Sequence, residues 1–231
     1  MQPFIDYFSR NGEKYLDAVF QHLAVSGFSL ALAVIIALPL GISAAKNEGT
    51  KTAITGLFAA LRIVPSLAVL FVCVPLMGTG LRPAVTALSL LAIPPILINT
   101  TLAFSSIPEA VLETARGMGM SAGRIFFWIK APLSLPLVLA GVKTAAVEII
   151  ASATLAAYIG GGGLGTIIFT GLGLMRNEFL LIGGVSIALL SIAADFILTK
   201  LENFLTRILF GGNPLKSAGF FRNSIDRGVQ S

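Results

Sequence analysis

The sequence has few charged residues: they fill only 12% of its 231 positions. Soluble globular domains average about 25% charged residues, so this chain has about half of the usual share. Hydrophobic residues, in contrast, make up 55% of the chain. This balance excludes an ordinary soluble domain and predicts an integral membrane protein that forms a single domain.

Cysteine and histidine are almost absent, with Cys73 and His22 the sole examples. One cysteine inside an apolar run can build neither a disulfide framework nor a metal site. His22 lies at the expected boundary of an apolar segment, where an interfacial role is more common than a catalytic one. The sequence therefore predicts no metal, no cofactor and no catalytic residue.

Two further classes of site are missing. The glycine cluster at 160–165 is followed by Thr166 and Ile167 rather than by the lysine of a phosphate-binding loop, so the chain has no nucleotide site of its own. The net charge of +5 does not indicate a nucleic-acid partner, because the basic residues are scattered between apolar segments. A cleavable signal is not expected either, because a mixed-charge segment precedes the first apolar run and that run is too long.

Five apolar segments are long enough to approach the roughly 20 residues that cross a bilayer as a helix. We expect a transmembrane domain at 23–209, after an amphipathic lead-in at 1–22 that lies along the membrane surface and before a flexible tail at 210–231. A run at 164–174 is too short to span and favours a re-entrant or interfacial segment, with a sixth crossing left open. The expected spans are 23–45, 53–77, 83–104, 136–158 and 179–198.

The distribution of lysine and arginine gives an expected orientation. With five spans and the N-terminus outside, ten basic residues fall on the inner side and four on the outer side. Cytoplasmic segments of membrane proteins carry such an excess of positive charge. The C-terminal tail and the polar segment between the third and fourth spans are therefore expected in the cytoplasm of a prokaryotic cell, and the protein in its plasma membrane.

Ionisable side chains inside the expected spans need an explanation. An arginine such as Arg62 costs at least about 2.5 kcal/mol at the centre of a membrane helix. It either faces the bundle interior and a translocation path or reaches to the interface, unless the true span starts after it. The sequence leaves these possibilities open. The same choice applies to Lys143, Glu148 and Asp195. Because Lys143 and Glu148 are five residues apart, they are not expected to pair with each other.

The polar segment at 106–132 separates the third and fourth expected spans. Ser106 and Glu109 have the spacing of a capping box, which predicts the start of a helix. Gly117 and Gly119 weaken that helix and predict a turn. The segment is too polar to lie in lipid.

A second helix is expected after this turn. Ser121 can cap its first residue, and Pro132 is expected to end it. Its apolar face would consist of Ile125, Phe126 and Ile129. The segment is thus predicted to form a helix–turn–helix hairpin that docks onto another protein.

Within this hairpin, Glu113-Thr-Ala115, then Gly119, Ile129 and Ala131-Pro132 resemble the EAA loop of ABC importer permeases. Thr114 and Ala131 depart from that pattern, but neither removes a charge or the glycine. In the family, this loop is the coupling helix that inserts into a groove on a separate ATPase subunit. The resemblance implies coupling roles for a set of five residues: Glu113, Ala115, Gly119, Ile129 and Pro132.

A narrower resemblance lies in Arg62-Ile-Val-Pro65-Ser-Leu-Ala68, which is similar to a segment of permeases for glycine betaine, carnitine and choline. Five spans with the loop between the third and fourth also resemble methionine-importer permeases. Together these resemblances imply an all-α permease that dimerises with a like or different subunit. They further imply a dimer of cytoplasmic ATPases, an extracytoplasmic substrate-binding protein, and no chemistry by the permease itself.

The resemblance implies import of a compatible solute such as glycine betaine, carnitine or choline. A permease for an amino acid such as methionine is the alternative within the family. An ion-coupled secondary transporter would instead use Glu148, Asp195 and Arg62 as a relay, and a membrane scaffold without transport is a further alternative. The expected translocation path or gate includes a set of residues from three segments: Arg62, Pro65, Glu148, Gly160, Gly161, Gly162 and Gly163.

Overall fold

In the computed structural model, residues 2–210 are described, and every regular element among them is a helix. Within these described residues, nine α-helices are joined by short turns, with one π-helical segment and one 3-10 turn. The protein is an all-α membrane protein, as predicted. In chain order, the elements are α1 (Gln2–Ala44), α2 (Glu48–Leu61), α3 (Ser66–Met77), α4 (Leu81–Ser105), α5 (Glu109–Gly117), α6 (Ala122–Ile125), the π segment (Phe126–Lys130), α7 (Ala131–Ala156), the 3-10 turn (Ala157–Ile159), α8 (Gly165–Gly173) and α9 (Asn177–Phe210).

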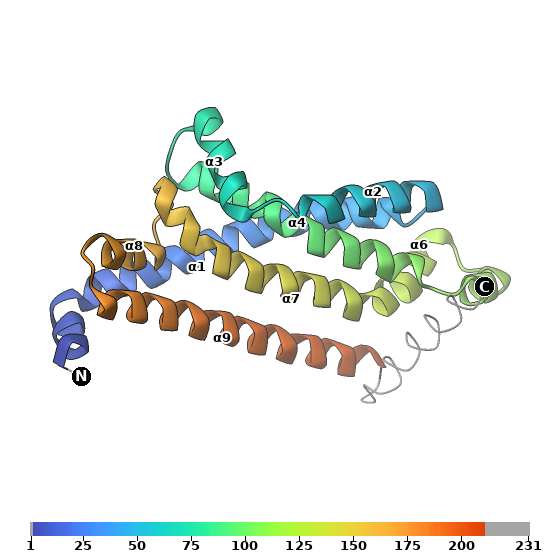
Figure 1. Cartoon of the computed structure of the whole chain (residues 1–231). Helices are drawn as coiled ribbons and strands as arrows, with labels where there is room; N and C mark the ends of the chain where they lie inside the picture. The colour runs from blue at the N-terminus through green and yellow to red at the C-terminus, as the bar shows by residue number, and fades with distance from the viewer. Residues whose placement is uncertain (1, 211–231) are drawn as a thin grey trace.

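Four long helices form the body of the molecule, with α4 packed between α1 and α7 and with α9 against α7 (Figure 1). Small residues let these helices approach closely, as membrane helices require. A Cβ atom added to Gly41 of α1 would lie 2.7 Å from Thr100 of α4, and one added to Gly141 of α7 would lie 2.7 Å from Asn99. The apolar core is completed by alanine and branched side chains, including Ala33, Ala92, Ile96 and Ile149.

Four of the described helical segments are long and apolar enough to cross a membrane, and a bent pair brings the total to five. The four are 7–44, 81–105, 122–159 and 177–209. Three of them contain the expected third, fourth and last spans with extensions at their ends. At its C-terminal end the last expected span is extended furthest, because its helix continues from residue 198 to Phe210. Of the expected tail at 210–231, all but Phe210 lies outside the described residues.

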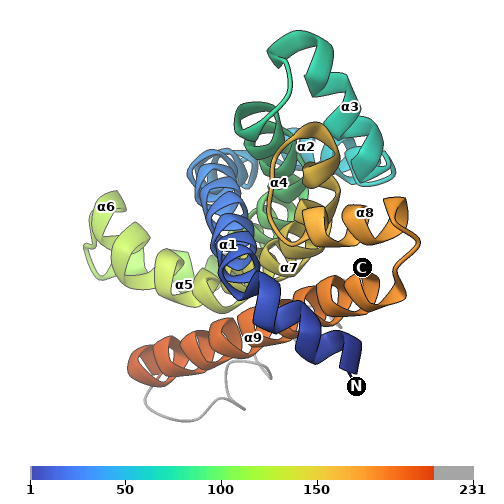
Figure 2. The same ribbon diagram turned by 90° about the vertical axis from the view of Figure 1, so that its left-hand side faces the viewer.

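The expected second span at 53–77 differs from the structure. It is not one straight helix but α2 and α3, which meet at an angle of 90° (Figures 1 and 2). Pro65 explains the break, because it has no N–H to continue the helix and takes an extended backbone at the start of α3 (φ −58°, ψ 132°). Helix α2 ends at Leu61, and Arg62 is its C-cap residue just before the bend.

At the expected boundary between a surface lead-in and the first span, residue 22, the structure shows no break in the helix. Helix α1 runs through this position, and the one residue with non-helical angles inside it is Asn11 (φ −128°, ψ 16°). The reason is packing. Ala18 is buried in a cluster with residues of α7, α8 and α9, and the buried His22 side chain bonds to the carbonyl oxygen of Ile150, with a distance of 2.9 Å from Nε2. The segment before residue 22 therefore belongs to the bundle.

The hairpin also differs from expectation at both of its ends. Ser106 does not cap α5, because it closes the end of α4 and its hydroxyl donates to the carbonyl oxygen of Ala103. Pro132 does not end the second helix, which continues from α6 through the π segment into α7. The N–H of Ala131 bonds five residues back, to Phe126. This wider turn accommodates the proline, which would otherwise clash with the carbonyl four residues earlier.

The bundle has two distinct ends (Figure 1). The hairpin formed by α5 and α6 lies at the same end as the last residues of α1 and α9. Helices α3 and α8 and the first residues of α1 lie at the opposite end. We refer to these as the hairpin end and the glycine-loop end, since residues 160–163 connect α7 to α8 at the latter.

Candidate functional site

The first candidate site is the hairpin, which has a small apolar core of its own. Ile107, Leu112, Ala115 and Ile125 are buried in one cluster, and Ile129 packs against it. Two members of the sequence motif, Ala115 and Ile129, therefore hold the two helices of the hairpin together. The contacts of Ala115 and Ile129 in this cluster are thus made within this chain.

The turn of the hairpin has the hydrogen bonds of a Schellman helix end. The N–H of Met120 donates to Ala115 over 3.1 Å, and the N–H of Gly119 donates to Arg116 over 2.9 Å. Gly119 takes the left-handed backbone that this motif requires, with φ of +75°. A Cβ atom added at Gly119 would meet no atom of the chain within 4 Å. The glycine is thus explained by its backbone angle and not by close packing.

Glu113 lies on the exposed side of α5 and makes no ion pair within residues 2–210, whereas Glu109 pairs with Arg116 over 2.6 Å. Sequence reasoning missed three large apolar side chains that are exposed on the same hairpin. Met118, Phe127 and Trp128 have 69%, 71% and 77% of their surface exposed. In the sequence, these exposed side chains could have been recognised from the position of Phe127 and Trp128 next to the expected apolar face of the second helix. Pro132 is half-buried at the join with α7.

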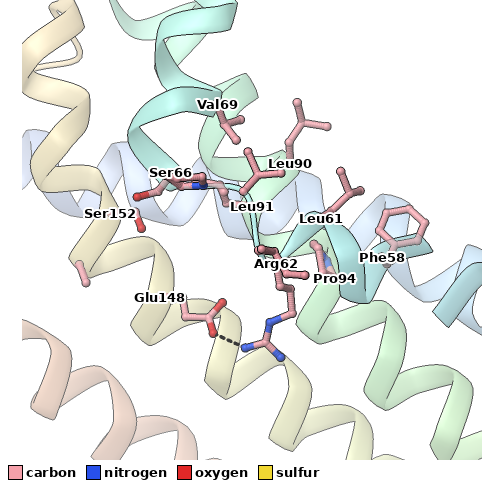
Figure 3. Close-up of a pocket in the computed structure, with 14 residues that line it drawn as sticks. Phe58, Leu61, Arg62, Ser66, Val69, Leu90, Leu91, Pro94, Glu148 and Ser152 are labelled. Carbon is pink, nitrogen blue, oxygen red and sulfur yellow. Dashed lines mark hydrogen bonds and ion pairs between the residues drawn. The ribbon is translucent and has the colours of Figure 1, made fainter. Parts of the chain in front are cut away.

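The second candidate site is a cavity of about 540 Å³ at the break between α2 and α3. Its lining includes Arg62, Pro65 and Glu148, which the sequence singled out separately, together with Ser66 and Ser152. Figure 3 shows the Arg62 guanidinium group and the Glu148 carboxylate pointing towards each other across the gap between α2 and α7. Nη2 of Arg62 lies 2.8 Å from Oε1 of Glu148.

The two remaining charged groups of the expected spans have other positions. Lys143 lies 3.7 Å from a carboxylate oxygen of Glu202 and 3.3 Å from the hydroxyl oxygen of Thr199, so it links α7 to α9. Asp195 is exposed on α9 and does not line the cavity. As expected, Lys143 and Glu148 do not pair with each other.

The glycines at 160–163 are not brought to this cavity but lie at the glycine-loop end, against α1. The side chain of Gln21 accepts a hydrogen bond from the N–H of Gly163 over 3.2 Å. A Cβ atom added to Gly163 would lie 3.0 Å from Nδ1 of His22 and 3.1 Å from its Cα atom. The loop at Gly162 and Gly163 is therefore bonded to α1 and closely packed on it.

The structure thus combines a bundle of long apolar helices, a half-exposed ion pair at a cavity and a protruding hairpin, as expected of the membrane subunit of a transporter. Residues 37–207 match the family of binding-protein-dependent transport system inner membrane components. The chain belongs to this family and is a permease subunit of an ABC importer, as its hairpin sequence predicted.

Relatives with assigned transport roles cover most of the chain. It is 37% identical over 206 residues to the carnitine transport permease protein OpuCB of Listeria monocytogenes, covering 89% of this chain and 94% of that protein. It is 34% identical over 206 residues to the choline transport system permease protein OpuBB of Bacillus subtilis, covering 89% and 95%. The osmoprotectant import permease protein OsmW of Salmonella typhimurium is 34% identical over 207 residues, covering 87% and 96%.

The fold has a solved counterpart in an inward-facing structure of the MetNI methionine ABC transporter. The similarity has a TM-score of 0.64 and covers 80% of this chain and 95% of that one. At 24% sequence identity, this likeness shows the fold and not the substrate. The predicted resemblance to the permease core of a methionine importer is confirmed at this level.

Proposed function

We propose that this permease imports a compatible solute with a quaternary ammonium group, such as glycine betaine, carnitine or choline. The observation that supports this most directly is the set of relatives, which are named for carnitine, choline and osmoprotectants and match nearly the whole chain. The methionine alternative has only the fold similarity in its favour. Selectivity is expected to lie mainly in a separate binding protein, since the cavity at Arg62 has no aromatic cage for the ammonium group.

The hairpin is proposed as the coupling element that docks on an ATPase subunit. Its turn leaves Gly119 open to the surroundings. Its exposed apolar residues form a surface that a partner protein would bury on docking. ATP-driven closure of an ATPase dimer would move the hairpins of two permease subunits, alike or different. Helix α7 would carry that motion into the membrane, since it continues from the hairpin without a break.

Orientation follows from the same proposal. The hairpin end would face the cytoplasm with the C-terminus, and the N-terminus would lie outside, in agreement with the ten-to-four excess of basic residues. The path would run past Arg62, Pro65 and Glu148. The glycines at 160–163 are proposed to close its outer end. A reporter fused at Met118 should be cytoplasmic and one fused at Gly162 external, and an external signal at Met118 would refute the coupling role.

The proposed function is tested by determining which source of energy drives uptake. Uptake of labelled glycine betaine, carnitine and choline is measured in cells that contain the permease, its binding protein and its ATPase. We expect uptake to vanish when the ATPase gene is deleted and to survive the collapse of ion gradients while ATP is maintained. Purified permease alone should not hydrolyse ATP. Uptake driven by an ion gradient in vesicles without any ATPase would overturn the proposal in favour of a secondary transporter.

A further inference from the structure

The ion pair between Arg62 and Glu148 has unused bonding capacity that faces a cavity. Each side chain is only partly covered, with 46% and 41% of its surface exposed. The pair uses one nitrogen of the guanidinium group and one oxygen of the carboxylate. Within the described part of the chain, the other donors of Arg62 and the second oxygen of Glu148 have no hydrogen-bond partner. Both groups can therefore accept a further ligand.

The surroundings of the pair are otherwise largely apolar. Phe58, Leu61, Val69 and Leu91 line the same cavity, and Ser66 contributes a hydroxyl group. Charged groups inside a membrane protein pair with one another and face cavities, and they commonly mark the route of a substrate. The volume of about 540 Å³ lies within the range of about 300–1,000 Å³ that is typical of small-molecule sites.

The chemistry of the pair matches a solute with one positive and one negative group. A ligand with a single charge would leave one member of the pair without a partner when it displaced the other. A zwitterion can replace both at once, because its carboxylate takes the place of Glu148 on Arg62 and its cation takes the place of Arg62 on Glu148. Every charge then remains paired throughout the exchange. The apolar lining is suited to the methyl groups of a quaternary ammonium ion.

We infer that Arg62 and Glu148 form a transient subsite for a zwitterionic solute, with Arg62 receiving the carboxylate and Glu148 the cation. This inference rests on the proposed function and narrows it to zwitterions at this point of the path. The weakness of a partly exposed pair is an advantage here, because the pair must open and reform with each passage. Phe58 is the one aromatic residue of the lining, so the ammonium group would be held loosely and released readily.

The test uses the whole importer in cells, with labelled glycine betaine as the zwitterionic probe and choline as a probe that lacks a carboxylate. Arg62→Gln should reduce the maximal rate of glycine betaine uptake at least tenfold and that of choline less than threefold. Glu148→Gln should likewise reduce glycine betaine uptake more than choline uptake, since Glu148 receives the cation only when the carboxylate of the same solute takes its place on Arg62. Arg82→Gln is the matched control, because it removes an exposed arginine of α4 that does not line this cavity.

Failure of the inference can be separated from failure of the proposed function. If Arg62→Gln reduces both probes equally, or if the unmodified importer takes up choline but no zwitterion, the inference is wrong and the proposed function stands. If the unmodified importer takes up neither these two probes nor carnitine, both fall.

A second measurement applies if glycine betaine is the single probe transported. Saturation-transfer NMR follows the methyl signal of glycine betaine with the purified permease–ATPase complex in lipid nanodiscs, without binding protein. We expect transfer with the unmodified protein and with Asp195→Asn, which alters a carboxylate on α9, and its loss in Arg62→Gln and Glu148→Gln. Equal transfer in all four proteins, or none in the unmodified one, would overturn the inference.

Discussion

Two glycine turns at opposite ends of the bundle share the same left-handed backbone but have opposite surroundings. Gly119 has φ of +75° and Gly163 has φ of +82°. Around Gly119, no atom of the chain lies within 4 Å of the position a Cβ atom would occupy, whereas at Gly163 that position lies 3.0 Å from the His22 ring. The turn at Gly163 is thus packed against its own chain, whereas the turn at Gly119 is open to the surroundings. A partner protein can therefore contact the turn at Gly119 directly, whereas the turn at Gly163 is constrained by its own chain.

The largest effect is expected from Gly163→Val. A β-branched side chain is strained at positive φ, by roughly 1–3 kcal/mol, and its Cβ atom would press on the backbone of α1 at His22. Because a loss of about 1–2 kcal/mol of stability can change the abundance of a protein in cells several-fold, the amount of folded permease should fall several-fold. Immunoblots of membrane fractions measure this loss, and uptake should fall in proportion. Normal abundance would contradict the packing of this loop on α1.

Gly119→Asp should separate function from folding. Aspartate is among the few residues that adopt the left-handed backbone readily, and its side chain would enter open space. The permease should therefore accumulate to within about twofold of its normal level. Uptake and co-purification of the ATPase should be lost, because the added carboxylate occupies the space that the partner fills. Gly119→Asn is the control of equal size without charge, and it should lose less of both. If Gly119→Asp retains uptake and ATPase binding, the hairpin is only a connector.

A smaller effect is expected from Glu113→Ala. This carboxylate makes no ion pair within residues 2–210, so its removal should not change the stability of the permease. An exposed ion pair with a basic group on the ATPase would contribute under about 1 kcal/mol, which corresponds to a factor of about five in affinity. Titration of the ATPase onto the permease in nanodiscs measures this factor. A loss greater than about tenfold would indicate a buried contact rather than an exposed one.

The smallest effect is expected from Gly117→Ala, which changes a glycine two residues before the open turn. Gly117 is helical and has open space around it, so alanine should stabilise α5 by up to about 1 kcal/mol. Uptake should stay within about twofold of normal, since no left-handed angle is disturbed. Uptake assays that show a large loss would extend the region covered by the partner from Gly119 back to α5.

Several features were readable from the sequence because they depend on short-range order. The hairpin was predicted from spacing within about twenty residues, and the helical spans from the length of apolar runs. The family followed from the pattern around Glu113 and Gly119, and the match over residues 37–207 confirms it. The coupling and path roles of individual residues remain predictions.

Other features depend on contacts between distant parts of the chain, which no local pattern encodes. Arg62 and Glu148 are 86 positions apart, so each was recognised as a costly charge but their pairing was not. His22 was assigned to an interface because its neighbours in sequence change from polar to apolar, yet its partner is a carbonyl oxygen of α7. Arg62 and Pro65 interrupt the apolar run at 53–77, but the 90° angle between α2 and α3 was not predicted, because composition alone gives the length of a span and not its direction.

The continuous helix from α6 through α7 limits the changes of length that this chain can accept. Each residue added to or removed from a helix rotates everything beyond it by about 100°. Since the helix is continuous from α6 to α7, deleting one residue between the hairpin and Glu148 would turn this carboxylate away from Arg62 or twist the hairpin by the same angle. The stretch between them should therefore accept many substitutions but very few single-residue insertions or deletions.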